Sequence, residues 1–338
     1  MTLYCGIDLH STSSHLCVID ETDRELLSKK VKNRLDVILR ELEPYREELV
    51  GVVVESTFNW YWLVDGLMDA DHVVHLANPA AMSPYKGLKY TDDRHDARWL
   101  AHLLRLDLLP TGYIYPKEER PVRDLLRKRG QLVRQRTASV LSLGNLWVRN
   151  TGEMLRGNDL KNLTVDQVES RMGTGELALA FESTMAVIET FDQQIARVEK
   201  AVLARGRLKE GYEILTSIPG VGQVLGLTIL YETGDISRFP GVGNYTSYCR
   251  CVGSKRLSHG KKKGEGNRRN GNRYLSWAFI EGANFAVRYE PRARRFFERK
   301  QAKKNRAYGI RALASKLARA SYFMMRDRTL FDPDLLFA

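Results

Sequence analysis

The chain has 338 residues, 43% of them hydrophobic, which is enough for two or three domains with their own cores. Its 53 Lys and Arg against 41 Asp and Glu give a net charge of +12, which favours a polyanionic partner, with anionic lipid as the competing interpretation. No apolar run approaches the roughly 18 residues that span a bilayer. The segment "MTLYCGIDLH" lacks the features of a secretion signal, and four cysteines are too few for a disulfide framework. We expect a cytoplasmic protein with no membrane partner.

Residues 1–112 form the first expected domain. Three short strand-like runs separated by polar turns predict an antiparallel meander: 3–9, 14–20 and 25–31. Helical and strand patterns then alternate: a helix at 35–45, a buried strand at 49–56, a helix at 60–70, a strand at 72–78 and a helix at 96–109. This order is typical of an α/β RNase H-like (RuvC-like) fold, whereas a doubly wound nucleotide-binding fold would begin with a βαβ unit.

Residues 113–205 predict a basic helix and a coiled-coil region. Pro121 lies near the N-terminus of a long, arginine-rich helix. After a polar break at 150–175, apolar residues three and four apart predict a coiled-coil seam: Phe181, Met185, Ile188, Ile195, Val198 and Val202. A helical bundle that packs on its own chain fits the same pattern, which Val187 and Phe191 broaden. Residues 206–338 predict a mainly α-helical C-terminal domain.

Four carboxylates of the first domain are candidate metal ligands. Asp8 lies within the first strand, Glu55 ends the buried strand, and Asp93 and Asp96 open the last helix. Each has a structural alternative, and Asp92 or Asp93 is a good helix cap. In the predicted fold, however, all four converge at one end of the sheet. Clustered carboxylates repel unless a cation lies between them, and Mg²⁺ prefers such oxygen ligands and polarises phosphoryl oxygens.

The stretch "SIPGVGQVLGLTIL" contains a Pro-Gly loop between two apolar helical segments. The loop residues are Pro219, Gly220, Val221 and Gly222. The pattern predicts a helix-hairpin-helix, in which glycines let backbone N–H groups approach a phosphate. An ordinary turn between two core helices is the alternative.

A basic, glycine-rich loop is expected at 253–273. Its cations predict a nucleic-acid phosphate cradle: Lys255, Arg256, Lys261, Lys262, Lys263, Arg268, Arg269 and Arg273. Ser254 and Ser258 lie inside it, and a serine becomes a useful nucleophile when its proton is removed or cations assist its attack. A solvated loop with incidental serines is the alternative. The basic helix with Arg123 and Arg127 offers either a second polyanion surface or a solvated face.

Five motifs occur together and in order: "GIDLHS", "VVVEST", "DDRHDARWLA", "SIPGVG" and "LSHGKKKGEGNRRNGNRYL". With them the chain resembles the DEDD-type insertion-sequence transposases, the IS one-ten family with its IS eleven-eleven branch, and the related site-specific DNA invertases. The resemblance implies a RuvC-like domain, a coiled coil and a C-terminal transposase domain. By motif match, Asp8, Glu55, Asp93 and Asp96 are the metal tetrad for Mg²⁺ (or Mn²⁺), and Ser258 is the nucleophile, with Ser254 as the alternative.

The resemblance also implies a mechanism and partners. Ser258 would attack a DNA phosphodiester to give a phosphoserine–DNA intermediate, and the strands would rejoin by a second transesterification. Donor and target DNA, a structured noncoding guide RNA (bridge RNA) and a homo-oligomer, dimer or tetramer, formed through the coiled coil are implied, with the protein associated with the nucleoid. The main alternative is a RuvC-like metal-dependent nuclease or junction resolvase without a covalent step. A non-enzymatic DNA-binding protein whose acids are only caps is a third interpretation.

Overall fold

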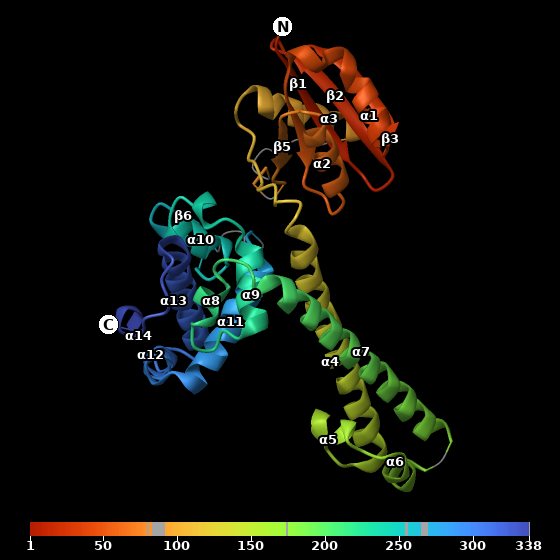
Figure 1. Ribbon diagram of the computed structural model, residues 1–338, viewed down its shortest axis with the longest axis vertical. Helices are drawn as coiled ribbons and strands as arrows, with labels where there is room; N and C mark the ends of the chain where they lie inside the picture. The colour runs from red at the N-terminus through yellow and green to blue at the C-terminus, as the bar shows by residue number, and fades with distance from the viewer. Residues whose placement is uncertain (80, 83–91, 174, 254–255, 265–269, 338) are drawn as a thin grey trace. The chain divides into compact units, whose positions relative to one another are not determined.

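The computed structural model describes residues 1–79, 81–82, 92–173, 175–253, 256–264 and 270–337. The chain divides into two compact units, Met1–Lys117 and Glu118–Ala338, shown in Figure 1. The predicted division into three domains, after residues 112 and 205, remains a prediction. Within the described residues, no helix is both long and apolar enough to cross a membrane.

The first unit is built on a five-stranded mixed sheet in the order β3-β2-β1-β4-β5. The strands are β1 (Leu3–Leu9), β2 (Ser13–Asp20), β3 (Glu25–Lys32), β4 (Leu49–Glu55) and β5 (Val74–Ala77). The first three form the predicted antiparallel meander, and β4 runs parallel to both β1 and β5. This topology confirms the RNase H-like fold, and the strand bounds lie within two residues of those predicted.

Helices cover both faces of the sheet. They are α1 (Leu35–Leu42), the 3-10 helix η1 (Glu43–Glu48), α2 (Tyr61–Asp69) and α3 (Asp93–Arg105). Apolar residues of α1 and α2 share one core with Cys5, Ile7 and Leu9 of β1, whereas Ala97 and Ala101 of α3 pack with Cys17 and Ile19 on the opposite face. The helix predicted at 35–45 ends at Leu42, because a proline in the first turn of η1 cannot continue the α-helical hydrogen bonds.

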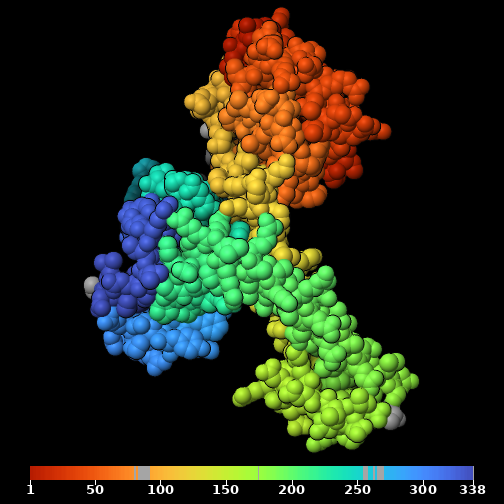
Figure 2. All heavy atoms as spheres, in the orientation of Figure 1, coloured from red at the N-terminus to blue at the C-terminus, as the bar shows by residue number. Residues whose placement is uncertain are grey.

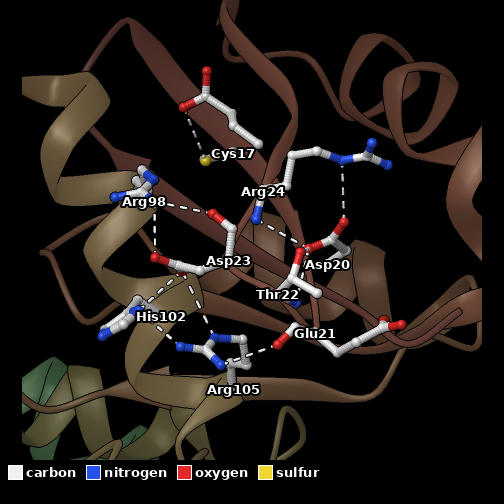
Figure 3. A network of polar contacts seen from close by, with 10 residues as sticks. Cys17, Asp20, Glu21, Thr22, Asp23, Arg24, Arg98, His102 and Arg105 are labelled. Atoms are coloured by element: carbon white, nitrogen blue, oxygen red, sulfur yellow. Dashed lines mark hydrogen bonds and ion pairs between the residues drawn. The ribbon is translucent and has the colours of Figure 1, made fainter.

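Two features hold α3 against the sheet. A Cβ atom on Gly6 of β1 would lie 2.0 Å from the carbonyl oxygen of Ala97, so only glycine permits this close approach. At the β2–β3 turn, the Asp23 carboxylate accepts from Arg98 at 2.8 Å and lies 2.9 Å from Nδ1 of His102, as Figure 3 shows. The position of α3, and therefore of the acids at its N-terminus, is fixed by contacts along its whole length.

The second unit begins with a helical hairpin. Helices α4 (Arg120–Thr151) and α7 (Glu176–Gly206) are antiparallel, because ion pairs join Arg129 to Glu199 at 2.8 Å and Arg136 to Asp192 at 2.6 Å. The predicted polar break contains two short helices, α5 (Gly157–Lys161) and α6 (Val165–Met172). Four residues of the predicted seam are buried within this chain: Phe181, Ile188, Ile195 and Val202. The seam packs on its own chain, and a coiled coil between copies stays a prediction.

The remainder is mainly helical, as predicted. The elements are α8 (Tyr212–Thr216), α9 (Gln223–Thr233), η3 (Ile236–Arg238), α10 (Val242–Tyr248), β6 (Arg256–Ser258), β7 (Lys261–Gly264), α11 (Arg273–Tyr289), α12 (Pro291–Gln301), α13 (Arg306–Asp327) and α14 (Pro333–Phe337). Every residue of α9 from Leu225 to Thr233 is buried. The expectation of a loop over 253–273 is wrong in one respect, since β6 and β7 form a hairpin there. The hairpin was not predicted because lysine and glycine, which dominate this segment, are depleted in strands.

Candidate metal site and serine hairpin

Asp8 is a buried acid at the end of the central strand, with only 3% of its surface exposed. Ile7 pairs with Val54 across the parallel β1–β4 ladder, so Asp8 and Glu55 follow them at the same end of neighbouring strands. Burial raises the pKa of Asp8 to about 6, with further increases from the charges of Glu55 and Asp96 and an opposing effect from His10. Three of the four predicted metal ligands therefore interact electrostatically at one end of the sheet.

Asp93 joins this cluster through His10. The Nε2 atom of His10 lies 2.9 Å from Oδ2 of Asp8 and 3.0 Å from Oδ1 of Asp93, and Lys30 pairs with Asp93 at 3.1 Å. The hydrogen bond from Lys30 lowers the pKa of Asp93, and the negative charge of Asp8 raises the pKa of His10. Asp92 caps α3 by accepting from the backbone N–H of His95 at 2.8 Å, which confirms the prediction that it serves as a cap.

The residues fit a divalent cation. One side-chain ligand atom from each of Asp8, His10 and Asp93 lies within 4.8 Å of the others. The buried Oδ2 of Asp8 has no hydrogen bond of acceptable geometry, although His10 is near, so its desolvation is incompletely compensated. Carboxylate oxygens suit Mg²⁺ and Mn²⁺, and imidazole is compatible with Mn²⁺. Sequence reasoning missed His10, although alternate residues of an extended chain share a face, which places it on the same side as Asp8.

Ser258 is the last residue of β6 and pairs with Lys261 of β7. The two residues between them, His259 and Gly260, have φ values of 50° and 72°, as a tight type I′ hairpin turn requires. The Oγ atom of Ser258 lies 3.2 Å from Nδ1 of His259. The serine therefore stands at a hairpin tip beside a potential proton acceptor and opposite a lysine. Sequence reasoning did not assign His259 this role.

The serine segment is the basic, glycine-rich stretch of residues 253–273, and the structure describes only some of its other predicted nucleic-acid contacts. Lys263 is exposed on β7, as is Lys261. Arg256 and Lys262 belong to the two strands. Four predicted residues lie outside the described residues: Ser254, Lys255, Arg268 and Arg269.

The C-terminal end of the serine segment is anchored by a buried carboxylate. Glu232 of α9 is 1% exposed and receives two bonds from Arg127, at 2.6 and 2.8 Å, and one from the side-chain amide of Asn272 at 2.7 Å. Asn272 also caps α11 by accepting from the N–H groups of Tyr274 and Leu275. The guanidinium of Arg127 is thus engaged inside the protein, which gives it a structural role beside the nucleic-acid role predicted for it. Half-buried Arg123 lies one turn earlier on α4.

Arg273 and the Pro-Gly loop are the remaining predicted nucleic-acid contacts. Arg273 is exposed at the start of α11. The loop of Pro219, Gly220, Val221 and Gly222 joins α8 to α9 and lines an open hollow of about 590 Å³. Gly220 packs on α11, since a Cβ atom there would lie 2.4 Å from the N atom of Ala286, and Val221 is buried. Gly222 caps α9 with open space around it, so the helix-hairpin-helix remains a prediction.

The topology and the acidic cluster define an RNase H-like protein with a candidate cation site at one end of its sheet. Two family profiles match the chain: "Transposase" (DEDD_Tnp_IS110) over residues 5–146 and "Transposase IS116/IS110/IS902 family" over residues 212–298. Together they match more than half of the chain. The chain belongs to the IS110 family of transposases.

Several proteins of insertion elements are similar to the chain. The transposase for insertion sequence element IS1111A of Coxiella burnetii is 25% identical over 84% of this chain and 78% of its own length. A probable family 20 transposase of Pseudomonas aeruginosa is 22% identical over 97% and 98%, respectively. An uncharacterised 43.6 kDa protein of insertion element IS110 from Streptomyces coelicolor is 27% identical over 47% of this chain, but the match spans only 40% of that relative.

A solved structure, T. thermophilus RuvC in complex with Holliday junction substrate, is 17% identical to the chain. The match covers 33% of this chain and all of RuvC, with a TM-score of 0.26. The assignment of the fold therefore rests on the strand order and pairing described above.

Proposed function

We propose that this transposase cuts and rejoins DNA through a covalent phosphoserine intermediate formed by Ser258, with a divalent cation held by Asp8, Glu55, Asp93 and Asp96. The observation that carries the proposal is the buried acid Asp8 with its neighbouring carboxylates at the end of an RNase H-like sheet. The serine hairpin supplies the nucleophile. Mg²⁺ or Mn²⁺ bound at the four acids would neutralise their charge and polarise phosphoryl oxygens.

The covalent step is a transesterification. The Ser258 Oγ–phosphorus bond forms, a phosphorus–oxygen bond of the DNA backbone breaks, and the departing DNA oxygen takes a proton to become a free hydroxyl. His259 is placed to accept the serine proton, because its Nδ1 lies 3.2 Å from Oγ. Lys261, opposite Ser258 in the hairpin, contributes positive charge near the attacked phosphate. Attack by the freed hydroxyl of another strand on the phosphoserine reverses these bond changes.

The proposed partners are donor and target DNA and a structured noncoding RNA of the element. Support for them comes from family membership and from the net charge of +12. Base pairing by a guide RNA would supply sequence specificity, while the protein binds backbone phosphates. The four acids belong to the first unit and Ser258 to the second. In the proposed reaction both act on the same phosphate, and they are contributed either by one chain or by two copies in a homo-oligomer.

The test is to incubate the protein with donor and target DNA, co-purifying RNA and Mg²⁺, and then run denaturing electrophoresis. We expect a protein–DNA adduct that is lost in Ser258→Ala and in Asp8→Asn. Ser247→Ala, which changes an exposed serine of α10, is the matched control and should keep the adduct. His259→Asn should slow adduct formation by about 100-fold, the lower end of general-base effects, because asparagine tolerates the positive φ but cannot take the proton.

A nuclease without a covalent intermediate is the second candidate. The observation that favours it is that the acidic cluster lies wholly within the first unit, and metal-dependent hydrolysis would require no serine. DNA cleavage without an adduct, unaffected by Ser258→Ala, would establish this alternative and refute the covalent proposal.

A further inference from the structure

The positive charge of the chain is concentrated in two segments. Residues 288–319 contain twelve Lys and Arg against Glu290 and Glu298, a net charge of +10. Residues 250–273 contain nine against Glu265, a net of +8. Since the whole chain carries +12, all remaining residues together carry −6. The second segment, 250–273, is the serine hairpin and its flanks, whereas the cations of 288–319 belong to no site described above.

Helix α12 and the start of α13 display this charge on the surface. Nine of the twelve cations are exposed, and they include Arg295, Arg299 and Lys303, spaced four residues apart on one face of α12 and its extension. The segment belongs to the blue surface of Figure 2. Of the two acids, Glu290 accepts from the N–H of Arg292 as the cap of α12. From outside the segment, Asp334 of α14 pairs with Arg292 at 2.6 Å. The patch, defined as the cations of residues 288–319, therefore has few compensating acids and keeps a large excess of positive charge.

The cations of the patch are crowded together. The charged groups of Arg299, Lys300 and Lys316 lie 5.7, 5.4 and 5.2 Å from the ring centroid of Phe296. Among the described residues, no carboxylate is within ion-pair distance of these three. Burial lowers the pKa of Lys316, and the charges of Arg299, Lys300 and Arg319 lower it further. A solvated face normally carries charges of both signs side by side. The repulsion among these cations therefore indicates a surface at which a bound anion would reduce that repulsion.

We propose that the patch on α12 and α13 binds the phosphate backbone of double-stranded DNA, at a surface separate from the serine hairpin. Duplex DNA presents one negative charge per about 1.7 Å of helix axis, and α12, at about 1.5 Å per residue, is long enough to face several phosphates. The exposed side chains are Lys and Arg, which suit contact with phosphates irrespective of sequence. The choice of DNA rests on the proposed function, because a transposase must hold DNA flanking the cut.

The test measures binding of the full-length protein to a 30-base-pair duplex of arbitrary sequence (about three turns) by fluorescence anisotropy over a salt series. The test variant is R295Q/R299Q/K303Q, and the matched control is R197Q/K200Q/R207Q, which removes three exposed cations of α7 and its C-terminal cap. Because each neutralised phosphate contributes about 0.9 to the log–log salt slope, the slope should fall by about 2 to 3 in the test variant and stay unchanged in the control. R295K/R299K keeps the charge and should retain the slope.

Equal slopes in the test and control variants would overturn the proposal. The proposal would also be overturned if the test variant kept its binding to duplex DNA and lost only its binding to a structured RNA hairpin or to vesicles containing phosphatidylserine. The surface would then bind RNA or lipid. Thermal unfolding of each variant shows whether it is folded. R295K/R299K changes two of the same sites while keeping their charge, so it should not unfold the protein. The measurement is made with EDTA, so it involves neither the cation nor Ser258, and its failure is distinguishable from failure to form the covalent adduct.

Discussion

Asp8 is the residue on which the proposed cation site depends. Its burial raises the pKa to about 6 from the ordinary value of 3.8, so the folded protein without metal binds a proton more tightly than the unfolded chain. The stability contributed by this proton is fully present below about 3.8 and is lost as the pH rises through about 6. A bound cation favours the ionised carboxylate and should lower the pKa again.

We therefore expect the Asp8 carboxyl to titrate near pH 6 in metal-free protein and at lower pH with Mg²⁺ present. The measurement is the carboxyl carbon chemical shift by NMR against pH, assigned by comparison with Asp8→Asn. Asp36, an exposed acid whose pKa is lowered by its bond from Arg34, serves as the control and should titrate below its ordinary range in both conditions. A midpoint near 4 for Asp8 without metal would show that its burial is compensated by other means.

Glu232 governs a second charged network, in the core of the second unit. Glu232→Ala would leave the guanidinium of Arg127 and the amide of Asn272 without their shared partner. Breaking a buried pair by removing one member costs about 3–5 kcal/mol, so we expect the free energy of unfolding to fall by that amount. Chemical denaturation checks this value. The control Glu182→Ala, at an exposed position of α7, should change it by less than about 0.5 kcal/mol. An equal effect of both substitutions would contradict the structural role of Glu232.

Among the elements, α3 determines where two of the four acids lie. Gly6→Ala would place a methyl group 2.0 Å from the Ala97 carbonyl oxygen and 2.7 Å from the Ala101 nitrogen. Both contacts are with backbone, so the helix must move away from β1. We expect lower thermal stability and at least tenfold weaker Mn²⁺ binding, measured by electron paramagnetic resonance. Misplaced ligands that reduce the binding free energy by about 1.4 kcal/mol are enough for a tenfold loss of affinity.

The matched control for this substitution is Gly112→Ala. A Cβ atom there would lie 3.5 Å from the Leu76 carbonyl oxygen, which is ordinary contact. Mn²⁺ binding should be unchanged in this variant. Unchanged binding in Gly6→Ala as well would mean that Asp93 and Asp96 are not held in place by the approach of α3 to β1, or that they do not bind the ion.

Elements with strong local patterns could be predicted from the sequence, and those that depend on distant partners could not. Short strand-like runs between polar turns predicted β1, β2 and β3 within one residue, because the turns delimit each strand locally. The β6–β7 hairpin was missed, since its stability comes from a two-residue turn that favours positive φ rather than from apolar residues. The carboxylate that engages Arg127 lies 105 residues away, and no local rule relates the two.

The candidate site shows the same division. Asp8 could be singled out because an aspartate is disfavoured within a strand, and Glu55 because it ends a buried strand. The sequence left Asp92 or Asp93 as the cap of the last helix, and the structure shows that it is Asp92. His10 was missed because a histidine beyond a strand end carries no pattern of its own. Its proximity to Asp93 requires α3 to cross β1, which is a property of the tertiary structure.

At the scale of the whole molecule, the α4–α7 hairpin is the candidate surface for association between copies of the chain. The predicted seam of α7 is covered by α4, so an oligomer formed through this hairpin must use its outer faces. Leu141 of α4 and Val187 of α7 are 64% and 47% exposed. The ion pairs Arg129–Glu199 and Arg136–Asp192 set the register of the two helices. In this register, positions 141 and 187 lie at the same level along the hairpin. Exposed apolar side chains on adjacent helices are a feature of association surfaces.

If the proposed oligomer forms through the hairpin, charges at these positions should dissociate it. We expect the wild type to be at least dimeric and Leu141→Glu/Val187→Glu to sediment as a monomer of 38.7 kDa without loss of helical circular dichroism, since neither side chain is buried within the chain. Glu182→Lys/Glu189→Lys, which places charge changes at exposed positions of α7 that already carry charge, is the control and should keep the wild-type mass. Analytical ultracentrifugation distinguishes the outcomes. A wild-type monomer, or an oligomer that survives the glutamates, would exclude this hairpin face as the contact and require the acids and Ser258 to meet through another surface.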